Sequence, residues 1–314
     1  MKLLLTTTSF QDTPGKHQEL LYDQGFDIDT LRGPIPEAEL LPIIDQYDAV
    51  LCGDDEYTEN VLRKGRAGNL KYISKYGVGL DKIDLDTARE LGIPVTNCPA
   101  VNQVSVAEHV LALLFTFEKN VHLQYNSTKE GSWKRWVGQE IQGKTLGIIG
   151  MGAIGKELSK KANALGLTVI AFDIVKDDAF LATHPEINFV SDLELIYKEA
   201  DIISLHIPHT PKTEYLINEN VIFGKLQKSP ILINTSRGML VDSNAIIKGL
   251  QEGKLRGYLA DVLVTEPMAG NEPLRGVENV LITPHVGSRT FQSVERQGLM
   301  AVENLLGLLK KGNL

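Results

Sequence analysis

Three stretches in the second half of the chain carry side chains that could act together on a carbonyl group. Arg237 lies in INTSRGMLVD, Glu266 in LADVLVTEPM and His285 in NVLITPHVGS. Each residue follows a run of apolar and β-branched residues that predicts a buried strand. Ligands of open parallel sheets bind beyond the carboxyl ends of the strands, so we expect all three side chains at one binding edge.

These three residue types suit the reduction of a 2-oxo acid. An imidazolium can protonate the carbonyl oxygen as negative charge grows there, which is the role we predict for His285. A carboxylate on the far ring nitrogen would fix the tautomer and favour the charged imidazole, the role predicted for Glu266. Arg237 could pair with the substrate carboxylate in a planar fork and polarise the carbonyl. Taken singly, each residue also fits a purely structural role.

A glycine motif upstream predicts a dinucleotide cofactor. In KTLGIIGMGAIGKELSKK, Gly150, Gly152 and Gly155 have G-x-G-x-x-G spacing between a strand and a helix. The first glycine allows a tight turn, the second admits a pyrophosphate, and the third lets helix and strand pack closely. The next strand ends at Asp173, where a carboxylate would accept the ribose hydroxyls and repel a 2′-phosphate. NAD is therefore favoured over NADP, although Lys176 could soften that preference, and a strand cap is the structural alternative for Asp173.

The elements that must position these residues alternate along the chain. Apolar runs at 2–6, 49–52 and 70–74 are separated by amphipathic helical stretches, and a second series of strands extends from 144 to 283. Such alternation predicts crossover units and parallel sheets. We expect an α/β fold with two doubly wound parallel-sheet (Rossmann/flavodoxin-like) domains, which suits a chain of 314 residues.

Two helical stretches are unusually long. Residues 103–127 contain neither Gly nor Pro and are strongly apolar over 104–117. That pattern predicts one helix buried on more than one side, either by both domains or by a second subunit. Residues 291–312 predict one amphipathic helix that ends at Lys310, Lys311 and Gly312.

Composition excludes several classes of partner. The net charge of −8, without a basic cluster, argues against nucleic acid. The start MKLLL is too short for a signal peptide, and no run reaches the ~18 apolar residues of a membrane span. Cys52 and Cys98 stand alone, which favours a reducing compartment, and we expect a cytoplasmic protein. His206 and His209 have no third ligand nearby in the sequence, so no metal site is predicted.

Five motifs resemble, in order and over nearly the whole chain, the D-isomer-specific 2-hydroxyacid dehydrogenase family: KYGVGLDKIDLDTARELGIPVTN, SVAEHVLALLF, GKTLGIIGMGAIG, INTSRGMLVD and ITPHVGS. The N-terminal half is most similar to the phosphoglycerate dehydrogenase-like branch. The resemblance implies reversible hydride transfer between NADH and the C2 carbonyl of a small 2-oxo acid. The expected pair is 3-phosphoglycerate and 3-phosphohydroxypyruvate.

The resemblance also implies an organisation and a set of contacts. A discontinuous substrate domain, 1–98 and 289–314, would flank an inserted NAD-binding Rossmann domain, 99–288, and the helix from about residue 102 would form a homodimer. The substrate carboxylate would bind Arg237 and the backbone N–H groups of Val78 and Gly79. Together with the glycine motif, the implied cofactor contacts are Gly150, Gly152, Ala153, Ile154, Gly155, Asp173, Pro208, Thr213, Thr235, Ser236, Asp261, Gly287 and Ser288.

The substrate itself stays open at this stage. In the loop LCGDDEYT, residues 54–56 are acidic where phosphoglycerate dehydrogenases of this kind carry an arginine, and inward-pointing acids would disfavour a second anion. A phosphate could instead be held by Lys16, Arg32 or Lys75, or by backbone amides near 8–15. Hydroxypyruvate and glyoxylate reduction are therefore alternatives.

Two further classes of function compete with these. Formate dehydrogenases of the same superfamily carry Gln where this sequence has Glu266, which argues against that reaction. An NAD-sensing, corepressor-like binding protein is the other alternative. The complete set of Arg237, Glu266 and His285 favours an enzyme over a sensor.

Overall fold

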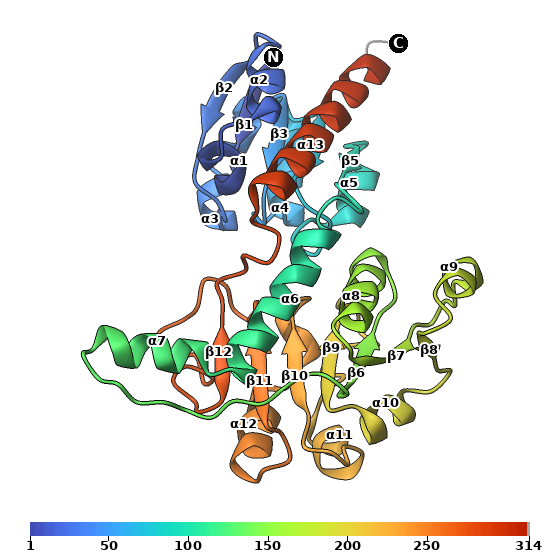
Figure 1. Ribbon diagram of the computed structural model, residues 1–314. Coiled ribbons are helices and arrows are strands. Elements are labelled where there is room, and N and C mark those ends of the chain that lie inside the picture. Colours follow the sequence, from blue (N-terminus) through green and yellow to red (C-terminus); the bar gives the residue numbers. More distant parts are fainter. Residues whose placement is uncertain (313–314) are drawn as a thin grey trace. The chain divides into compact units, whose positions relative to one another are not determined.

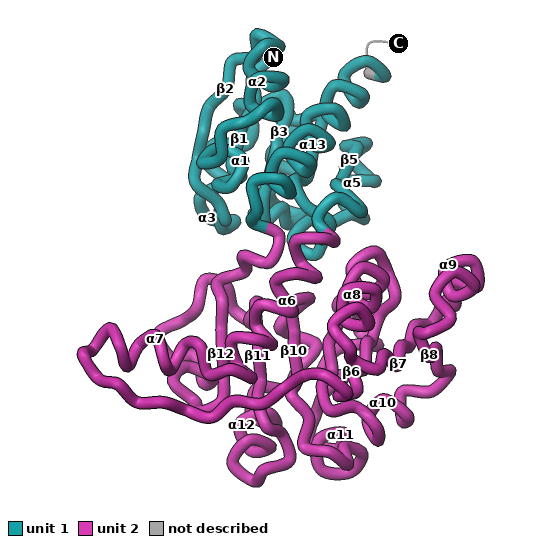
Figure 2. The backbone as a smooth tube through the Cα atoms, viewed as in Figure 1, with its two compact units in different colours: residues 1–102, 289–314 teal, residues 103–288 magenta. Residues whose placement is uncertain are grey.

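The computed structural model describes residues 1–312, and the chain divides into two compact units (Figure 2). Unit 1 comprises residues 1–102 and 289–314, and unit 2 comprises residues 103–288. Each unit contains one sheet whose strands are all parallel (Figure 1). The prediction of an α/β fold with two parallel sheets is confirmed.

Unit 1 has five strands in the order β2-β1-β3-β4-β5. The strands are β1 (Lys2–Leu5), β2 (Asp27–Thr30), β3 (Ala49–Cys52), β4 (Tyr72–Lys75) and β5 (Val95–Thr96). The helices are α1 (Thr8–Asp12), α2 (Lys16–Tyr22), α3 (Glu37–Leu40), α4 (Glu59–Ala67), α5 (Leu85–Glu90) and α13 (Phe291–Gly312), with a short 3₁₀ turn at Ile44–Gln46. The strand order reverses between β1 and β3, which is where open parallel sheets bind ligands.

The two faces of this sheet follow from the alternation of side chains along β1. Leu3 and Leu5 pack with Ala301, Val302 and Leu305 of α13, while Leu4 packs into a separate cluster on the opposite face. Successive side chains of a strand point to opposite faces, so a continuous apolar run is suited to a strand covered on both sides. The helix predicted over 291–312 is α13, and it covers one of these faces.

Unit 2 has seven strands in the order β12-β11-β10-β9-β6-β7-β8. The strands are β6 (Thr145–Ile149), β7 (Thr168–Phe172), β8 (Asn188–Phe189), β9 (Ile202–Leu205), β10 (Ile231–Asn234), β11 (Gly257–Ala260) and β12 (Val280–Ile282). The helices are α6 (Gln103–Glu118), α7 (Val121–Lys129), α8 (Ala153–Ala164), α9 (Asp178–Thr183), α10 (Leu193–Glu199), α11 (Glu219–Gly224) and α12 (Ser243–Gln251), with a 3₁₀ turn at Gly238–Leu240. The order reverses between β6 and β9, and this reversal is the switch point of the unit.

The single long helix expected over 103–127 is wrong. The chain forms α6, which packs against α8, and then turns into the separate helix α7 (Figure 1). Asn120 between them has a left-handed backbone with φ of 52°. Asparagine adopts that conformation more readily than other side-chain-bearing residues, so the helix is interrupted without Gly or Pro.

Glu118 fastens the end of α6 to the sheet of unit 2. Its buried carboxylate pairs with Arg256 at 2.5 Å and with Lys144 at 2.9 Å. Burial alone would raise the pKa of Glu118, but the hydrogen bonds from Arg256 and Lys144 outweigh it and the net pKa is lowered. The carboxylate is therefore ionised, and its charge is shared between two cations at the C-terminal end of the helix.

Candidate active site

The three candidate catalytic residues follow three neighbouring strands of unit 2. Arg237 follows β10, Glu266 follows β11 and His285 follows β12. These strands are adjacent in the sheet and parallel. Their carboxyl ends consequently lie at one edge, as the sequence predicts.

His285 and Glu266 are in direct contact. Nδ1 of the histidine ring lies 2.7 Å from Oε2 of Glu266, and Oε1 of the same carboxylate accepts the N–H of Leu263 at 2.8 Å. The backbone N–H of Leu263 thus orients the Glu266 carboxylate toward the His285 ring. Both side chains are about one third exposed, at 37% and 34%, so the pair is accessible from solvent.

The backbone at His285 is left-handed, with φ of 53°. Residues other than glycine rarely occupy this region, and those that do are concentrated at functional sites. The N–H of His285 donates to the carbonyl oxygens of Asp261, at 2.9 Å, and Thr283, at 3.0 Å. These two bonds hold the strained conformation and fix the direction in which the ring leaves the chain.

The carboxylate of Asp261 organises the loop that carries His285. It is 2% exposed and accepts Thr283 Oγ1 at 2.6 Å, Val286 N–H at 2.9 Å and Gly287 N–H at 2.7 Å. Burial raises the pKa of Asp261, but hydrogen bonds from His109, Thr283 and the two backbone groups outweigh it and leave the pKa below its ordinary value. The resemblance implies a cofactor contact for Asp261, which stays a prediction; within the chain, its carboxylate is bonded to this loop.

His109 is a site residue that sequence reasoning missed. Its Nε2 lies 2.9 Å from Thr283 Oγ1 and 3.3 Å from Oδ1 of Asp261. His109 belongs to α6, and 174 residues separate it from Thr283. Nothing in the local pattern of an apolar helix indicates such a contact, and only the fold reveals it.

Arg237 lies in a turn that packs against the glutamate loop. The backbone carbonyl of Arg237 accepts a hydrogen bond from Asn234 Nδ2 at 2.9 Å. The guanidinium of Arg237 donates through Nη1 to the carbonyl oxygen of Ser236 at 2.7 Å. A Cβ on the next residue, Gly238, would collide with the backbone of Leu263. The absence of a side chain at Gly238 therefore lets the Arg237 turn approach the loop that bears Glu266.

The glycine motif has the geometry of a dinucleotide cradle. Gly150 has φ of 105°, and a Cβ there would collide with His206 O. A Cβ on Gly155 would collide with the carbonyl oxygen of Gly150, so this glycine allows α8 to pack on β6. A Cβ on Gly152 would meet nothing within 4 Å. Gly152 thus borders open space at the N-terminus of a 12-residue helix, where a pyrophosphate binds in this motif.

Asp173 lies at the end of β7, within reach of the same loop. Its Oδ2 accepts Met151 N–H at 2.6 Å and its Oδ1 accepts Val175 N–H at 3.1 Å. A carboxylate has about four lone-pair sites, so ribose hydroxyls can still bind. Lys176, the residue that could soften a preference for NAD, pairs with Asp178 at 2.7 Å.

The other implied cofactor contacts surround the same edge of the unit 2 sheet. Ala153 and Ile154 form the first turn of α8, and Thr213 Oγ1 donates to Pro208 O at 2.8 Å. Ser236 Oγ donates to Leu205 O at 2.8 Å, Gly287 is buried, and Ser288 is the last residue of the unit. Thr235 Oγ1 is buried and has no hydrogen-bond partner among the described residues. A bound dinucleotide would give the Thr235 hydroxyl a hydrogen-bond partner and would fill the open space beside Gly152. These residues therefore fit NAD.

The implied carboxylate loop follows β4 in unit 1. Within residues 1–312, no protein group accepts the amide N–H of Val78 or of Gly79. The carbonyl of Val78 is held by Asn97 Nδ2 at 2.8 Å, and the Val78 side chain is 43% exposed. Two adjacent backbone donors in an accessible loop suit a carboxylate.

The acidic residues 54–56, in the loop after β3, are each bonded to other groups of unit 1. Asp54 pairs with Lys75 at 2.9 Å and Glu56 with Lys82 at 3.1 Å. Asp55 is fully buried and accepts the N–H groups of Ile35, at 2.8 Å, and Gly53, at 3.2 Å. The loop therefore uses its acids internally and does not exclude a second anion.

His206, which the sequence analysis considered as a metal ligand, has a structural contact instead. His206 Nε2 lies 2.8 Å from Ser204 Oγ, and burial lowers the pKa of His206 to about 4. Among the described residues, no group of three or more His, Cys, Asp or Glu side chains could hold a metal ion. Nor does any helix in residues 1–312 have the length and apolar content needed to span a bilayer.

Comparison with known proteins identifies the family. Residues 111–287 match the sequence model described as "D-isomer specific 2-hydroxyacid dehydrogenase, NAD binding domain". The chain belongs to the D-isomer-specific 2-hydroxyacid dehydrogenase family. Unit 2, which contains the whole of the matched region, is accordingly the NAD-binding domain of this family member, and the predictions of family and cofactor are confirmed.

Relatives within the dehydrogenase family differ in length and in name. The D-3-phosphoglycerate dehydrogenase of Methanocaldococcus jannaschii is 35% identical over 99% of this chain, and the chain spans 58% of that protein. The glyoxylate reductase of Thermofilum pendens is 36% identical over 88% of this chain and 83% of that enzyme. A crystal structure of a protein from Thermus thermophilus is similar with a TM-score of 0.87 at 36% identity, covering 99% of this chain and 97% of that one.

Proposed function

We propose that this family member is an NAD-dependent D-2-hydroxyacid dehydrogenase, which transfers hydride reversibly between NADH and the C2 carbonyl of a small 2-oxo acid. The observation that carries the proposal is the contact between His285 and Glu266 at 2.7 Å, at the carboxyl edge of a sheet that also bears the dinucleotide motif. A histidine oriented by a carboxylate is the arrangement that general acid catalysis requires. A purely NAD-sensing protein would not need it.

The proposed roles keep the reaction balanced. The hydride that forms the new C–H bond at C2 would come from NADH held by the glycine loop. His285, protonated and oriented through Nδ1 by Glu266, delivers a proton from Nε2 to the carbonyl oxygen. The products are the 2-hydroxy acid and NAD⁺, and the imidazole regains its proton from solvent.

Arg237, Val78 and Gly79 would bind and orient the substrate. The two backbone N–H groups and the guanidinium are suited to the C1 carboxylate, since all are donors and one is charged. The arginine would also stabilise charge that develops on the carbonyl oxygen. The cofactor phosphates would lie on the glycine loop at the N-terminus of α8, with the adenosine ribose at Asp173.

Replacement of the proposed acid tests this function. His285→Ala should reduce the rate of 2-oxo acid reduction about 10²- to 10⁴-fold, because the proton donor is lost. The affinity for NADH, measured by nucleotide fluorescence, should hardly change, since the glycine loop is intact. A variant with the wild-type rate, or a wild-type protein inert toward every 2-oxo acid tested, would contradict the proposal.

For the substrate, we propose the phosphoglycerate dehydrogenase-like pair of 3-phosphoglycerate and 3-phosphohydroxypyruvate, with hydroxypyruvate and glyoxylate as alternatives. Named relatives of similar identity include both kinds of enzyme. The internal pairing of residues 54–56 supports a site that tolerates a second anion. Reduction of phosphorylated and unphosphorylated 2-oxo acids, followed at the absorbance of NADH, distinguishes these substrates.

We further propose that the protein forms a homodimer through the region that begins at about residue 102. Helix α7 and the segment after it expose large apolar side chains: Val121 at 51%, Tyr125 at 62%, Trp133 at 81% and Val137 at 95%. Apolar surface of this kind is typical of an interface. Sedimentation at several concentrations should give twice the monomer mass, and Trp133→Asp should weaken the association; a wild-type monomer at micromolar concentration would contradict it.

We also propose a cytoplasmic location. Cys52 and Cys98 are both buried and unpaired, as is usual in a reducing compartment. Fractionation of the source cells tests this, and recovery of the protein outside the cytoplasm would contradict it.

A further inference from the structure

We infer that unit 1 contains a subsite for a second anionic group of the substrate, with Arg289 as its cation. This inference rests on the proposed function and specifies its substrate class: 2-oxo acids that carry a phosphate or a carboxylate at the end distant from C1. The sequence-based candidates for such a role were other cations. The structure favours Arg289 over them for the reasons that follow.

Of the three cations considered from the sequence, Arg32 and Lys75 are bonded to carboxylates, and Lys16 is not among the residues that line the cavity described below. Arg32 forms a two-pronged pair with Asp12, at 2.6 and 2.7 Å. Lys75 is 3% exposed and bonded to Asp54 and to the carbonyl of Tyr76, at 2.9 and 3.1 Å. A guanidinium or ammonium already matched to a carboxylate gains little from a second anion, so neither is a good receptor.

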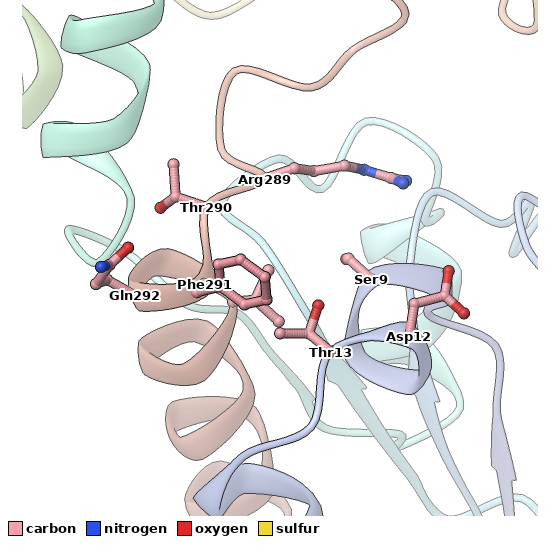
Figure 3. A pocket seen from close by; sticks show the side chains of 8 residues that line it. Ser9, Asp12, Thr13, Arg289, Thr290, Phe291 and Gln292 are labelled. Atoms are coloured by element: carbon pink, nitrogen blue, oxygen red, sulfur yellow. The ribbon is translucent and has the colours of Figure 1, made fainter.

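Arg289 lines a cavity of about 410 Å³ that lies wholly within unit 1 (Figure 3). The lining residues are Ser9, Asp12, Thr13, Arg289, Thr290, Phe291, Gln292 and Val294. In Figure 3 the side chains of Arg289, Ser9 and Asp12 lie to one side of the Phe291 ring. That volume is within the range of small-molecule sites.

The cation in this cavity is not neutralised by a carboxylate. Its guanidinium donates to Thr8 Oγ1 at 3.1 Å, and in the part of the chain that the structure describes no Asp or Glu forms an ion pair with it. Asp12 lines the same cavity, but Arg32 compensates its charge. The pKa of Asp12 is held low first by the hydrogen bond from Arg32, with a smaller contribution from the charge of Arg289. The lining thus contains one arginine and one carboxylate, and the carboxylate is already bonded to Arg32, which lies outside the lining.

The fold adds two features that favour an anion there. Ser9, Asp12 and Thr13 follow β1, at the switch point of the unit 1 sheet, where open parallel sheets bind ligands. The first turn of the 22-residue helix α13 contributes Phe291 and Gln292 to the lining. The N-terminus of this helix, which is the positive end of its dipole, therefore lies at the cavity.

The chain itself limits how far this cation can lie from the proposed acid. Arg289 follows His285 by four residues. A fully extended segment of that length separates the two Cα atoms by at most about 14 Å, whatever its conformation. One arginine side chain and a short substrate can span such a distance.

The test compares substrates on the whole 314-residue chain. Steady-state reduction would be measured with NADH and four 2-oxo acids: 3-phosphohydroxypyruvate, oxaloacetate, hydroxypyruvate and pyruvate. Arg289→Gln should raise KM about 10- to 100-fold for the two acids with a second anionic group, because a charge-assisted hydrogen bond is lost. KM for hydroxypyruvate and pyruvate should change less than about threefold on the same reasoning. Arg289→Lys should recover part of the loss, since it keeps the charge but not the fork.

The comparison of the two anionic acids identifies the group that the subsite prefers. A larger effect on 3-phosphohydroxypyruvate indicates a phosphate, and a larger effect on oxaloacetate indicates a carboxylate. Arg66→Gln, an exposed change on α4 in the same unit, is the matched control and should alter none of the four values.

A direct binding measurement separates failure of this inference from failure of the proposed function. Inorganic phosphate should bind wild-type protein in calorimetry, and Arg289→Gln should abolish the binding while circular dichroism shows an intact fold. If the enzyme reduces 2-oxo acids but Arg289→Gln changes all four KM values equally or not at all, the subsite is refuted and the enzymatic function stands. If no 2-oxo acid is reduced yet phosphate binding depends on Arg289, the dehydrogenase function is refuted and an anion site remains.

Discussion

Glu266 contacts the Nδ1 atom of His285 with one carboxylate oxygen and accepts a backbone N–H of its own loop with the other. Both carboxylate oxygens of Glu266 are therefore held in place, and the negative charge lies next to Nδ1, the ring nitrogen that the proposed reaction does not use. A negative charge so placed stabilises the imidazolium relative to the neutral ring. The pH dependence of the reaction should report this charge directly.

Glu266→Gln should lower the pH above which reduction fails, since an amide does not stabilise the protonated ring. At about pH 8 the rate should fall about 10- to 100-fold, with a smaller loss at about pH 5.5, because acid favours the imidazolium in both proteins. Rate profiles over that range measure the effect. Glu278→Gln, an exposed change just before β12, is the control, and an unmoved profile in Glu266→Gln would count against the pair.

Asp261→Asn should impair catalysis without removing any group that touches the substrate. The amide cannot accept all the hydrogen bonds that the carboxylate receives from Thr283, Val286 and Gly287, so the His285 loop should shift. A displacement of about 1 Å can cost about 10²-fold in rate. We expect a fall of that order in kcat, and an unchanged kcat would show that the loop holds its shape without this carboxylate.

The same carboxylate should make stability depend on acid pH. The pKa of Asp261 is lower in the folded chain than in the unfolded one, so its stabilising contribution is complete above the unfolded value of about 3.9. It is lost as the pH falls through the folded-state value. Urea unfolding of wild type should therefore weaken more steeply below about pH 4 than that of Asp261→Asn; parallel curves would contradict this.

Asp173→Ala should relax the choice of cofactor. Loss of a charged acceptor for the ribose hydroxyls should weaken NADH binding about 10- to 100-fold and improve the relative use of NADPH. Because Asp173 also accepts the N–H of Met151, Asp173→Asn is needed to separate charge from loop structure. Asp178→Ala, which only releases Lys176, is the comparison and should change NADH binding far less; a wild-type preference for NADPH would contradict the role of Asp173.

Glu118→Gln should destabilise unit 2. The change leaves Arg256 and Lys144 without their buried partner, and removal of one member of a buried ion pair costs about 3 kcal/mol. Denaturant unfolding measures the loss, with the exposed Glu130→Gln as control. A free energy of unfolding within about 0.5 kcal/mol of wild type would show that the pair contributes little.

The regular elements of the fold were predictable where burial dictates the sequence. Strands such as β6 and β9 consist mostly of apolar residues because helices cover both faces of the sheet. By contrast, β2 reads Asp-Ile-Asp-Thr and β8 has only two residues, so neither has an apolar run. They are strands because a neighbouring strand offers hydrogen bonds, which is tertiary information.

The candidate site divides in a similar way. His285, Glu266 and Arg237 could be identified because each follows a recognisable strand, and the glycine motif has a fixed spacing. His109 could not, since its contact with Thr283 spans 174 residues and leaves no local pattern. Arg289 was missed because an exposed arginine beside a helix start looks like any surface residue until the cavity is seen.

The left-handed backbone at His285 decides which substitution would best preserve the loop for crystallography. Alanine is strained at φ of 53°, whereas asparagine tolerates that region and has a smaller side chain than histidine. His285→Asn should thus keep the loop in place while it stops proton transfer. Crystals of this variant could be soaked with NADH and a 2-oxo acid together. The unreacted ternary complex could then be observed.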